Sequence, residues 1–252
     1  MKVLALDTSG SALSIAVAED GFVISHYWLR HGKTHAEALL PGVEAALSGP
    51  DIKISAIDVF AAVSGPGSFT GIRIGISTVK AFAYACNAPV AGITAPDALA
   101  KNLEGYAGAL ICPVINANKG NIYQTIYRCG GGVSVPAGVC EGAGAGAGAL
   151  RRIADTALCT AGEAVERLKY AFERNPDIDG VIFNGDAAID YIERFRSELG
   201  DRACAVACGL ALYQNAASAA LLAYEEAIND RLIAPELLVP QYYNAGYAKT
   251  DK

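Results

Sequence analysis

Apolar residues near the start of the chain alternate with small residues, and this pattern predicts strands. Residues 3–6 form a short apolar run, and apolar side chains recur at every second position over 13–17. A period of two residues is typical of a strand that buries one face. Asp20-Gly21 is a turn pair, and a third β-rich run covers residues 22–28. The chain is therefore expected to open with an antiparallel meander of three strands.

A helix is predicted from residue 34 to about residue 48. Thr34 and Glu37 have the spacing of a capping box, in which each side chain accepts a hydrogen bond from the other residue's backbone N–H. Apolar residues then recur three and four positions apart: Ala36, Leu39, Leu40, Val43 and Leu47. Pro41 predicts a kink or a short first turn, and Gly49-Pro50 predicts the end of the helix.

The remaining elements are predicted from the same two periods. We expect strands over 59–63, 89–93, 111–115, 122–127, 181–183 and 203–207. We expect helices over 72–87, 96–103, 164–172, 189–199 and 210–228. The order strand, polar turn, strand occurs at 3–17 and again at 111–127, which is a weak internal repeat of the kind that duplicated folds leave.

Two further segments have unusual compositions. Residues 130–149 are rich in Gly and Ala, which predicts a flexible surface loop rather than a site. Residues 235–252 are aromatic and are expected to form an extended tail on the surface of the body.

The composition narrows the class of protein. Of the 252 residues, 52% are hydrophobic and 18% are charged, which is the opposite of a disordered chain. Polar, Gly and Pro residues break the apolar runs, so we expect no membrane-spanning helix. Asp7 lies where a secretory signal needs its apolar stretch, so we expect a cytoplasmic protein.

The charge and the cysteine content argue against further classes of function. The net charge is -6 and no basic run is present, so we do not expect the chain to grip RNA without a partner. The seven cysteines are interpreted as small buried hydrophobes in a reducing compartment. Cys204 and Cys208 do not have the common spacing of zinc or redox pairs.

Two polar turns carry candidate chemistry. Asp7, Thr8 and Ser9 follow the first strand, and Asn116 and Lys119 lie in the corresponding turn of the second half. Backbone N–H groups and hydroxyls in such turns can face a phosphate and its metal, and two facing turns could grip a nucleotide. An ordinary polar hairpin turn accounts for the same residues.

The segment from Ser64 to Gly71, Ser-Gly-Pro-Gly-Ser-Phe-Thr-Gly, is the most specific one in the chain. Its glycines permit a tight turn from strand to helix. The N–H groups at the start of the helix could bind an anion, with Arg73 one turn further on. A turn that only packs the helix against the sheet is the alternative. The segment is not a Walker loop, because no Gly-Lys-Ser/Thr follows.

These motifs together resemble the TsaB (YeaZ) family, which belongs to the bacterial machinery that makes N6-threonylcarbamoyladenosine on tRNA. The resemblance rests on Leu6-Asp7-Thr8-Ser9, Thr34-His35-Ala36-Glu37 and the block from Ser64 to Gly75. It implies an α/β fold of the duplicated actin/Hsp70/hexokinase-like (ASKHA) type with two lobes. We expect an N-terminal lobe over 1–104, a C-terminal lobe over 105–209, and a terminal helix and tail over 210–252 that pack back on the body.

The resemblance also implies a function. It suggests a scaffold subunit with no catalytic residues of its own, which supports the catalytic TsaD subunit and joins TsaE. The same resemblance implies a homodimer when the chain is alone, contact with tRNA only through the complex, no cofactor of its own, and ATP or ADP in the assembled complex. The implied partner face is formed by the helices near 34–48 and 70–87. Its candidate residues are His35, Leu39, Leu40, Val43, Ile72, Ile76 and Val79. Some of these residues must instead face the chain's own sheet, and the sequence does not apportion them.

Several positions differ from the motifs of the relatives, and two alternative functions stay open. The metal motif His-x-Glu-x-His of TsaD corresponds here to His35, Glu37 and Leu39, and Leu39 cannot bind a metal. Asn116 and Asn118 replace an acid and a base that relatives often have, which weakens the expected nucleotide grip. The alternatives are an ATP-dependent phosphotransferase of the same fold, with Asp7 as its acid, or a metallopeptidase-like protein.

Overall fold

The computed structural model describes residues 1–30, 34–106, 108–130, 150–200 and 202–243. They form two compact units. The first unit contains residues 1–98 and 213–242, and the second contains residues 99–212 and Tyr243. The predicted lobe limits, 1–104 and 105–209, differ from these boundaries by a few residues. The described part of the C-terminal segment belongs almost entirely to the first unit.

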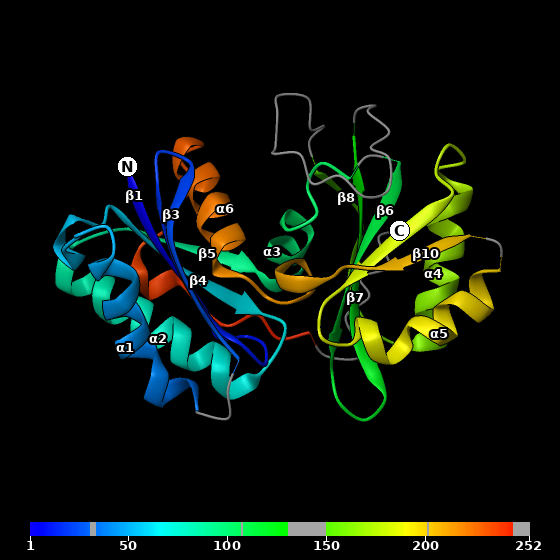
Figure 1. Cartoon of the computed structure of the whole chain (residues 1–252), viewed down its shortest axis with the longest axis horizontal. Helices are drawn as coiled ribbons and strands as arrows, with labels where there is room; N and C mark the ends of the chain where they lie inside the picture. The colour runs from blue at the N-terminus through cyan, green and yellow to red at the C-terminus, as the bar shows by residue number, and fades with distance from the viewer. Residues whose placement is uncertain (31–33, 107, 131–149, 201, 244–252) are drawn as a thin grey trace. The chain divides into compact units, whose positions relative to one another are not determined.

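The first unit is built on a mixed sheet with the strand order β3-β2-β1-β4-β5 (Figure 1). Its strands are β1 (Lys2–Asp7), β2 (Leu13–Glu19), β3 (Phe22–Leu29), β4 (Val59–Gly65) and β5 (Val90–Thr94). The first three strands pair antiparallel, and β4 and β5 are added in parallel. The predicted opening meander is confirmed.

Helices cover both faces of this sheet. Figure 1 shows α1 (His35–Ser48) and α2 (Phe69–Cys86) on one face and α6 (Ala216–Ile228) on the other, and α3 (Ala95–Lys101) follows β5. The apolar sides of α1 and α2 join β1, β2 and β4 in one core cluster.

The predicted capping box at the start of α1 is present. The Thr34 backbone N and its Oγ1 both donate to Glu37 Oε2, at 3.0 and 2.7 Å, and Pro41 lies inside the helix, which continues to Ser48.

The predicted helix over 210–228 is wrong at its start. Residues Gly209–Leu212 form a short 3-10 turn, and α6 begins at Ala216. The reason is local, because the side chain of Asn215 accepts a hydrogen bond from the Ala217 N–H and caps the helix there.

The second unit repeats the topology of the first. Its strands are β6 (Ala109–Asn116), β7 (Asn121–Cys129), β8 (Leu150–Thr160), β9 (Gly180–Asn184) and β10 (Ala203–Val206). Their order is β8-β7-β6-β9-β10, in which again the first three strands pair antiparallel and the last two are added in parallel. Helices α4 (Ala161–Glu173) and α5 (Ala188–Leu199) complete the unit. The predicted duplicated α/β fold with two lobes is confirmed.

One strand was not predicted from the sequence, and some predicted segments lie outside the described residues. Strand β8 was not predicted, because Arg151, Arg152 and Asp155 interrupt its apolar pattern. The Gly/Ala-rich loop from residue 131 onward, Cys140 and the tail beyond Tyr243 lie outside the described residues. Among the helices that the structure describes, none is long and apolar enough to cross a membrane.

Candidate functional site

The polar turn after β1 is buried in the first unit. The side chains of Asp7, Thr8 and Ser9 are 0, 1 and 1% exposed. Thr8 Oγ1 donates to the Gly71 carbonyl at 2.6 Å, and the Ser9 N–H and hydroxyl donate to Asp7 Oδ1 at 2.9 and 2.7 Å. All three predicted nucleotide-binding residues of this turn therefore serve internal hydrogen bonds.

The carboxyl group of Asp7 lies in a closed environment, 0% exposed. Burial raises the pKa of Asp7 above its ordinary value, and the hydrogen bonds from Ser9 oppose this shift. Within the described residues, Asp7 Oδ2 and both amide atoms of Gln214 are buried without a hydrogen-bond partner. Gln214 also closes the turn, since a Cβ added at Gly10 would lie 2.4 Å from Gln214 Oε1.

The glycine-rich block packs the start of α2 directly onto this turn. A Cβ at Gly71 would lie 2.0 Å from the Thr8 carbonyl oxygen, and one at Gly75 would lie 2.4 Å from Thr8 Oγ1. The Ser68 N–H donates to the Ser9 carbonyl at 2.7 Å, and Ser68 Oγ accepts from the Gly71 N–H at 3.2 Å. These contacts support the packing interpretation of the block and explain why glycine is needed there.

The corresponding turn of the second unit is exposed. Asn116, Asn118 and Lys119 all lie at the surface, and the Asn118 N–H donates to Asn116 Oδ1 at 2.7 Å. Asn118, Lys119 and Gly120 have positive φ angles of 63, 54 and 78°. Asp186 Oδ1 accepts from the Asn116 N–H at 2.9 Å and holds the end of β6. The two turns belong to different units, so a nucleotide cleft that combines them stays a prediction.

The positions that align with the metal motif have structural roles here. His35 Nε2 lies 3.0 Å from the Gly10 carbonyl oxygen, Glu37 caps α1, and Leu39 is 2% exposed. Among the residues that the structure describes, no group of three or more His, Cys, Asp and Glu side chains is placed to hold a metal ion.

Most of the predicted partner-interface residues are core residues, and the prediction was wrong for them. Five of the seven candidates are at most 4% exposed and pack in the core cluster of the first unit: Leu39, Val43, Ile72, Ile76 and Val79. The helical period identifies the face that is buried, and that face is turned toward the chain's own sheet. Of the predicted set, Leu40 is exposed and His35 is half-buried.

The outer sides of α1 and α2 nevertheless carry an apolar surface. Leu40, Phe69 and Tyr84 are 61, 54 and 60% exposed, and the half-buried Ile74 and Phe82 pack against the core beneath them. We call this surface the α1–α2 face. Two open hollows lie on it. One is lined by Leu40 and Phe82 among other residues, and the other by Phe69 and Ile74.

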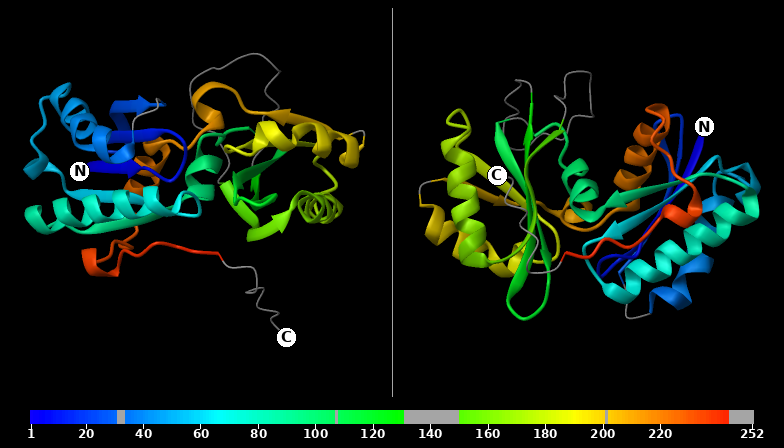
Figure 2. Two further views of the ribbon diagram at one scale, coloured as in Figure 1. Left: turned by 90° about the horizontal axis from the view of Figure 1, so that it is seen from below. Right: turned by 180° about the vertical axis from the view of Figure 1, so that it is seen from behind.

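A C-terminal strap, residues 235–242, runs along α2 and borders the α1–α2 face (Figure 2). Near one end of the strap, Tyr84 Oη donates to Glu236 Oε2 at 3.4 Å. At the other end, Arg73 Nε donates to the Tyr242 hydroxyl at 3.0 Å, and the guanidinium stacks on Phe69 at 3.8 Å. Neither Phe69, Tyr84 nor the strap was predicted for the face, because the polar residues between them hide its apolar character in the sequence.

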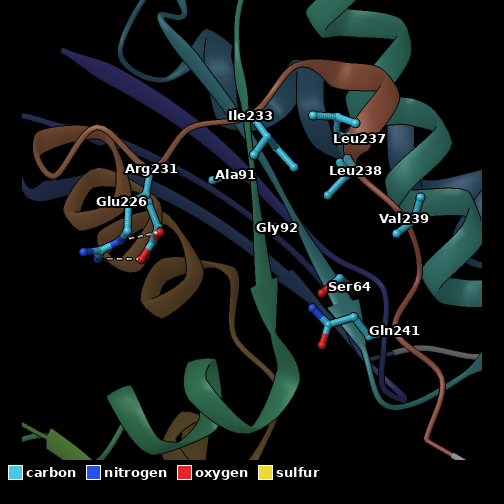
Figure 3. Close-up of a pocket in the computed structure, with 10 residues that line it drawn as sticks. All are labelled: Ser64, Ala91, Gly92, Glu226, Arg231, Ile233, Leu237, Leu238, Val239 and Gln241. Atoms are coloured by element: carbon cyan, nitrogen blue, oxygen red, sulfur yellow. Dashed lines mark hydrogen bonds and ion pairs between the residues drawn. The ribbon is translucent and has the colours of Figure 1, made fainter.

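The strap also closes a hollow of about 160 Å³ beside β5 (Figure 3). Figure 3 shows the Glu226–Arg231 ion pair on one side of the hollow and Ser64 with Gln241 on another. Arg231 meets the two Glu226 oxygens at 2.8 Å each, and the Gln241 N–H donates to the Ser64 carbonyl. Because the two charges neutralise each other, we assign no ligand to this hollow.

The sequence of the chain matches a known protein family and two named relatives. A family model described as "TsaD: tRNA N6-adenosine threonylcarbamoyltransferase" matches residues 30–183, more than half of the chain. The chain is 32% identical over 128 residues to the tRNA threonylcarbamoyladenosine biosynthesis protein TsaB of Bacillus subtilis, covering 51% of this chain and 56% of that protein. It is 33% identical over 129 residues to TsaB of Escherichia coli, covering 51% and 55%. The matches thus span about half the length of these relatives.

Solved structures agree on the fold. YeaZ from Pseudomonas aeruginosa superposes with a TM-score of 0.70 at 24% identity, covering 96% of this chain and 99% of that one. A second structure, of a protein described as having similarity to peptidase YEAZ from Pseudomonas aeruginosa, gives a TM-score of 0.72 with the same identity and coverage. The family model covers more than half of the chain, so the chain belongs to the family described as tRNA N6-adenosine threonylcarbamoyltransferase TsaD, and it is similar to TsaB proteins of that family.

Proposed function

We propose that the chain is a scaffold subunit of the complex that installs threonylcarbamoyl on N6 of adenosine 37 in tRNA. The names of its relatives in B. subtilis and E. coli support the pathway. The scaffold role is supported by one observation above all: within the described residues, α1 and α2 leave the large apolar side chains of Leu40, Phe69 and Tyr84 more than half exposed.

The proposed partner on the α1–α2 face is the catalytic TsaD subunit, with TsaE joining the assembly. Apolar side chains that pack in a desolvated centre carry most of the binding energy of an interface. Leu40, with Phe82 behind it, and Phe69, stacked by Arg73, are suited to such a centre. Glu44, Lys53 and Arg73 supply charges of both signs around it, as in the polar rim of an interface.

The competing function is an ATP-dependent phosphotransferase of the same fold. It would use Asp7 as its acid, and Asp7 is fully buried, with Oδ1 engaged by Ser9 and the turn closed by Gln214. The geometry therefore favours the scaffold over the kinase. ATP and ADP belong, in this proposal, to the assembled complex rather than to this chain.

A reconstituted modification assay tests the proposal. TsaD, TsaE, threonylcarbamoyl-adenylate and unmodified tRNA are incubated with and without the chain, and modified adenosine is quantified by mass spectrometry. We expect modification to need the chain and Leu40→Glu to reduce it strongly. Ile189→Glu is the matched control, because Ile189 is 56% exposed on α5 in the second unit. Modification that is equal without the chain, or ATP turnover by the chain alone, would contradict the proposal.

A further inference from the structure

Arg73 is held in place by two aromatic side chains of the first unit. Its guanidinium lies over the ring of Phe69, 3.8 Å from the ring centre, and its Nε donates to the Tyr242 hydroxyl at 3.0 Å. The centres of the Phe69 and Tyr242 rings are 5.3 Å apart, so the two rings also pack together. A guanidinium is planar and is attracted to an aromatic face. The three side chains therefore form a closed cluster that sets the orientation of the Arg73 guanidinium.

The C-terminal strap is anchored to the first unit immediately before Tyr242. Leu238 is 2% exposed and packs in the core cluster, and the Gln241 N–H donates to the Ser64 carbonyl at 2.8 Å. A flexible arginine loses rotamer freedom when a partner binds it, and this loss lowers the affinity. Because the anchored Tyr242 already holds Arg73, less of that freedom remains to be lost on binding.

The outer N–H groups of Arg73 have no acidic partner among the residues that the structure describes. A guanidinium carries five N–H donors, and the bond to Tyr242 uses only the one on Nε. Arg73 is exposed, and no acidic residue lies in the first turn of α2. Arg231 of the same unit, in contrast, binds both Glu226 oxygens at 2.8 Å. Arg73 thus presents two Nη groups that the described part of the chain leaves unused.

We propose that Arg73 is the residue through which the α1–α2 face binds a carboxylate of its partner. The occupant is an Asp or Glu side chain that accepts hydrogen bonds from both Nη groups. Arginine and carboxylate pair in this two-point geometry, which a lysine cannot reproduce. The inference rests on the proposed function and deepens it, because it names the chemistry of a side chain that the partner must bring to this face.

The surroundings of Arg73 favour a protein carboxylate over an RNA phosphate. RNA binding needs several Lys and Arg side chains on one face, and the net charge of this chain is -6. A single cation beside aromatic and aliphatic groups is instead typical of the centre of a protein interface, where Arg and aromatic residues are enriched. The hollow beside Arg73 holds no second Lys or Arg, and its other lining residues are Phe69, Thr70, Ile74, Ser77 and Thr78.

Titration of the TsaD subunit into variants of the full chain tests the proposal. Arg73→Gln removes the charge and should weaken binding about 30-fold. Arg73→Lys keeps the charge but not the planar fork, and we expect binding about tenfold weaker than that of the parent. The affinity of the parent should fall as NaCl is raised, and that of Arg73→Gln should fall less, because salt screens the proposed ion pair. A purely structural role of Arg73 would leave this salt dependence unchanged.

Tyr242→Phe tests the positioning separately. This variant keeps the ring against Phe69 but removes the acceptor of the Arg73 Nε–H, so we expect binding about threefold weaker. In the absence of any partner, NMR should show a slowly exchanging Arg73 Nε–H in the parent and faster exchange in Tyr242→Phe. Tyr170→Phe is the matched control, since the Tyr170 hydroxyl accepts from Arg174 Nη1 at 2.6 Å in the second unit. It should bind TsaD like the parent.

The outcomes separate this inference from the proposed function. Parental affinity and parental salt dependence in a folded Arg73→Gln protein would overturn the inference, while weaker binding by Leu40→Glu would keep the proposed function in place. An Arg73→Gln variant that lowers the affinity of the assembled complex for tRNA, but not that of the chain for TsaD, would assign Arg73 to RNA and would also overturn the inference. If the parent itself does not bind TsaD, the proposed function fails and the inference fails with it.

Discussion

The turn after β1 and the turn after β6 occupy equivalent places in two units of the same strand order, but their environments are opposite. Asp7, Thr8 and Ser9 are buried and bonded within the first unit. Asn116 and Lys119 are exposed in the second unit. The difference is produced by the elements beside the first turn, since the glycines of α2 and the Gln214 side chain press directly against it.

The residue types of a turn therefore do not determine its role. An acid followed by two hydroxyl residues can bind a phosphate, or it can hydrogen-bond to backbone groups and fix a helix against a sheet. In the first unit, the absence of side chains at Gly71 and Gly75 decides between these roles, because any side chain would separate α2 from the turn.

Gly71→Ala should be the most damaging change. Its Cβ would meet the Thr8 carbonyl oxygen, which is backbone and cannot move aside, so we expect a loss of about 3 kcal/mol in the free energy of unfolding. Gly120→Ala is the counterpart in the second turn. It has open space but a φ of 78°, so we expect a loss of about 1 kcal/mol. Urea unfolding measures both, and equal losses would contradict the packing role of the first turn.

Thr8→Val should have the next largest effect. It removes the hydroxyl that donates to the buried Gly71 carbonyl at 2.6 Å, so we expect a loss of about 2 kcal/mol. Asn116→Ala removes a side-chain acceptor at an exposed site and should cost about 0.5 kcal/mol. Thermal unfolding compares the two variants, and a Thr8→Val protein as stable as the parent would show that this hydrogen bond does not hold α2.

The charge of Asp7 should appear as a pH dependence of stability. Because burial raises the pKa of Asp7 in the folded chain, its contribution to stability is present at low pH and is lost as pH rises through that pKa. Asp7→Asn should therefore gain stability relative to the parent as the pH rises above about 4, the ordinary pKa of an aspartate. Asp20→Asn is the control with the opposite sign, since the terminal amino group lowers the pKa of Asp20. A stability difference between Asp7→Asn and the parent that does not change with pH would be the contrary result.

The smallest effect is expected at the second turn. Lys119 is exposed, so Lys119→Ala should change stability by no more than about 0.5 kcal/mol. We expect ADP with Mg²⁺ to leave the melting temperature of the isolated parent and of Lys119→Ala unchanged. A rise for the parent that disappears in Lys119→Ala would instead identify the second turn as a working nucleotide site.

The sequence predicts the local structure of this chain better than its surfaces. The opening meander and the Thr34–Glu37 capping box follow from short-range patterns, and both are present. Strand β8 escaped prediction because its pairing with β7, rather than its own apolar period, places Arg151 and Arg152 in a sheet. Helical periodicity correctly placed Leu39 and Ile76 on the apolar face of their helices. It does not determine whether that face packs against the chain's own sheet or against a partner. Leu40 was among the predicted residues, but the structure was needed to separate it from its buried neighbours and to add Phe69.

The affinity of the chain for the TsaD subunit is the most direct test of the account, which holds that an exposed helical face, and not a reactive group, is the chain's contribution. Isothermal titration is carried out with the parent, Leu40→Glu, Lys119→Ala and the control Ile189→Glu. The account predicts about tenfold or weaker binding for Leu40→Glu alone. Parental affinity in a folded Leu40→Glu protein would contradict it.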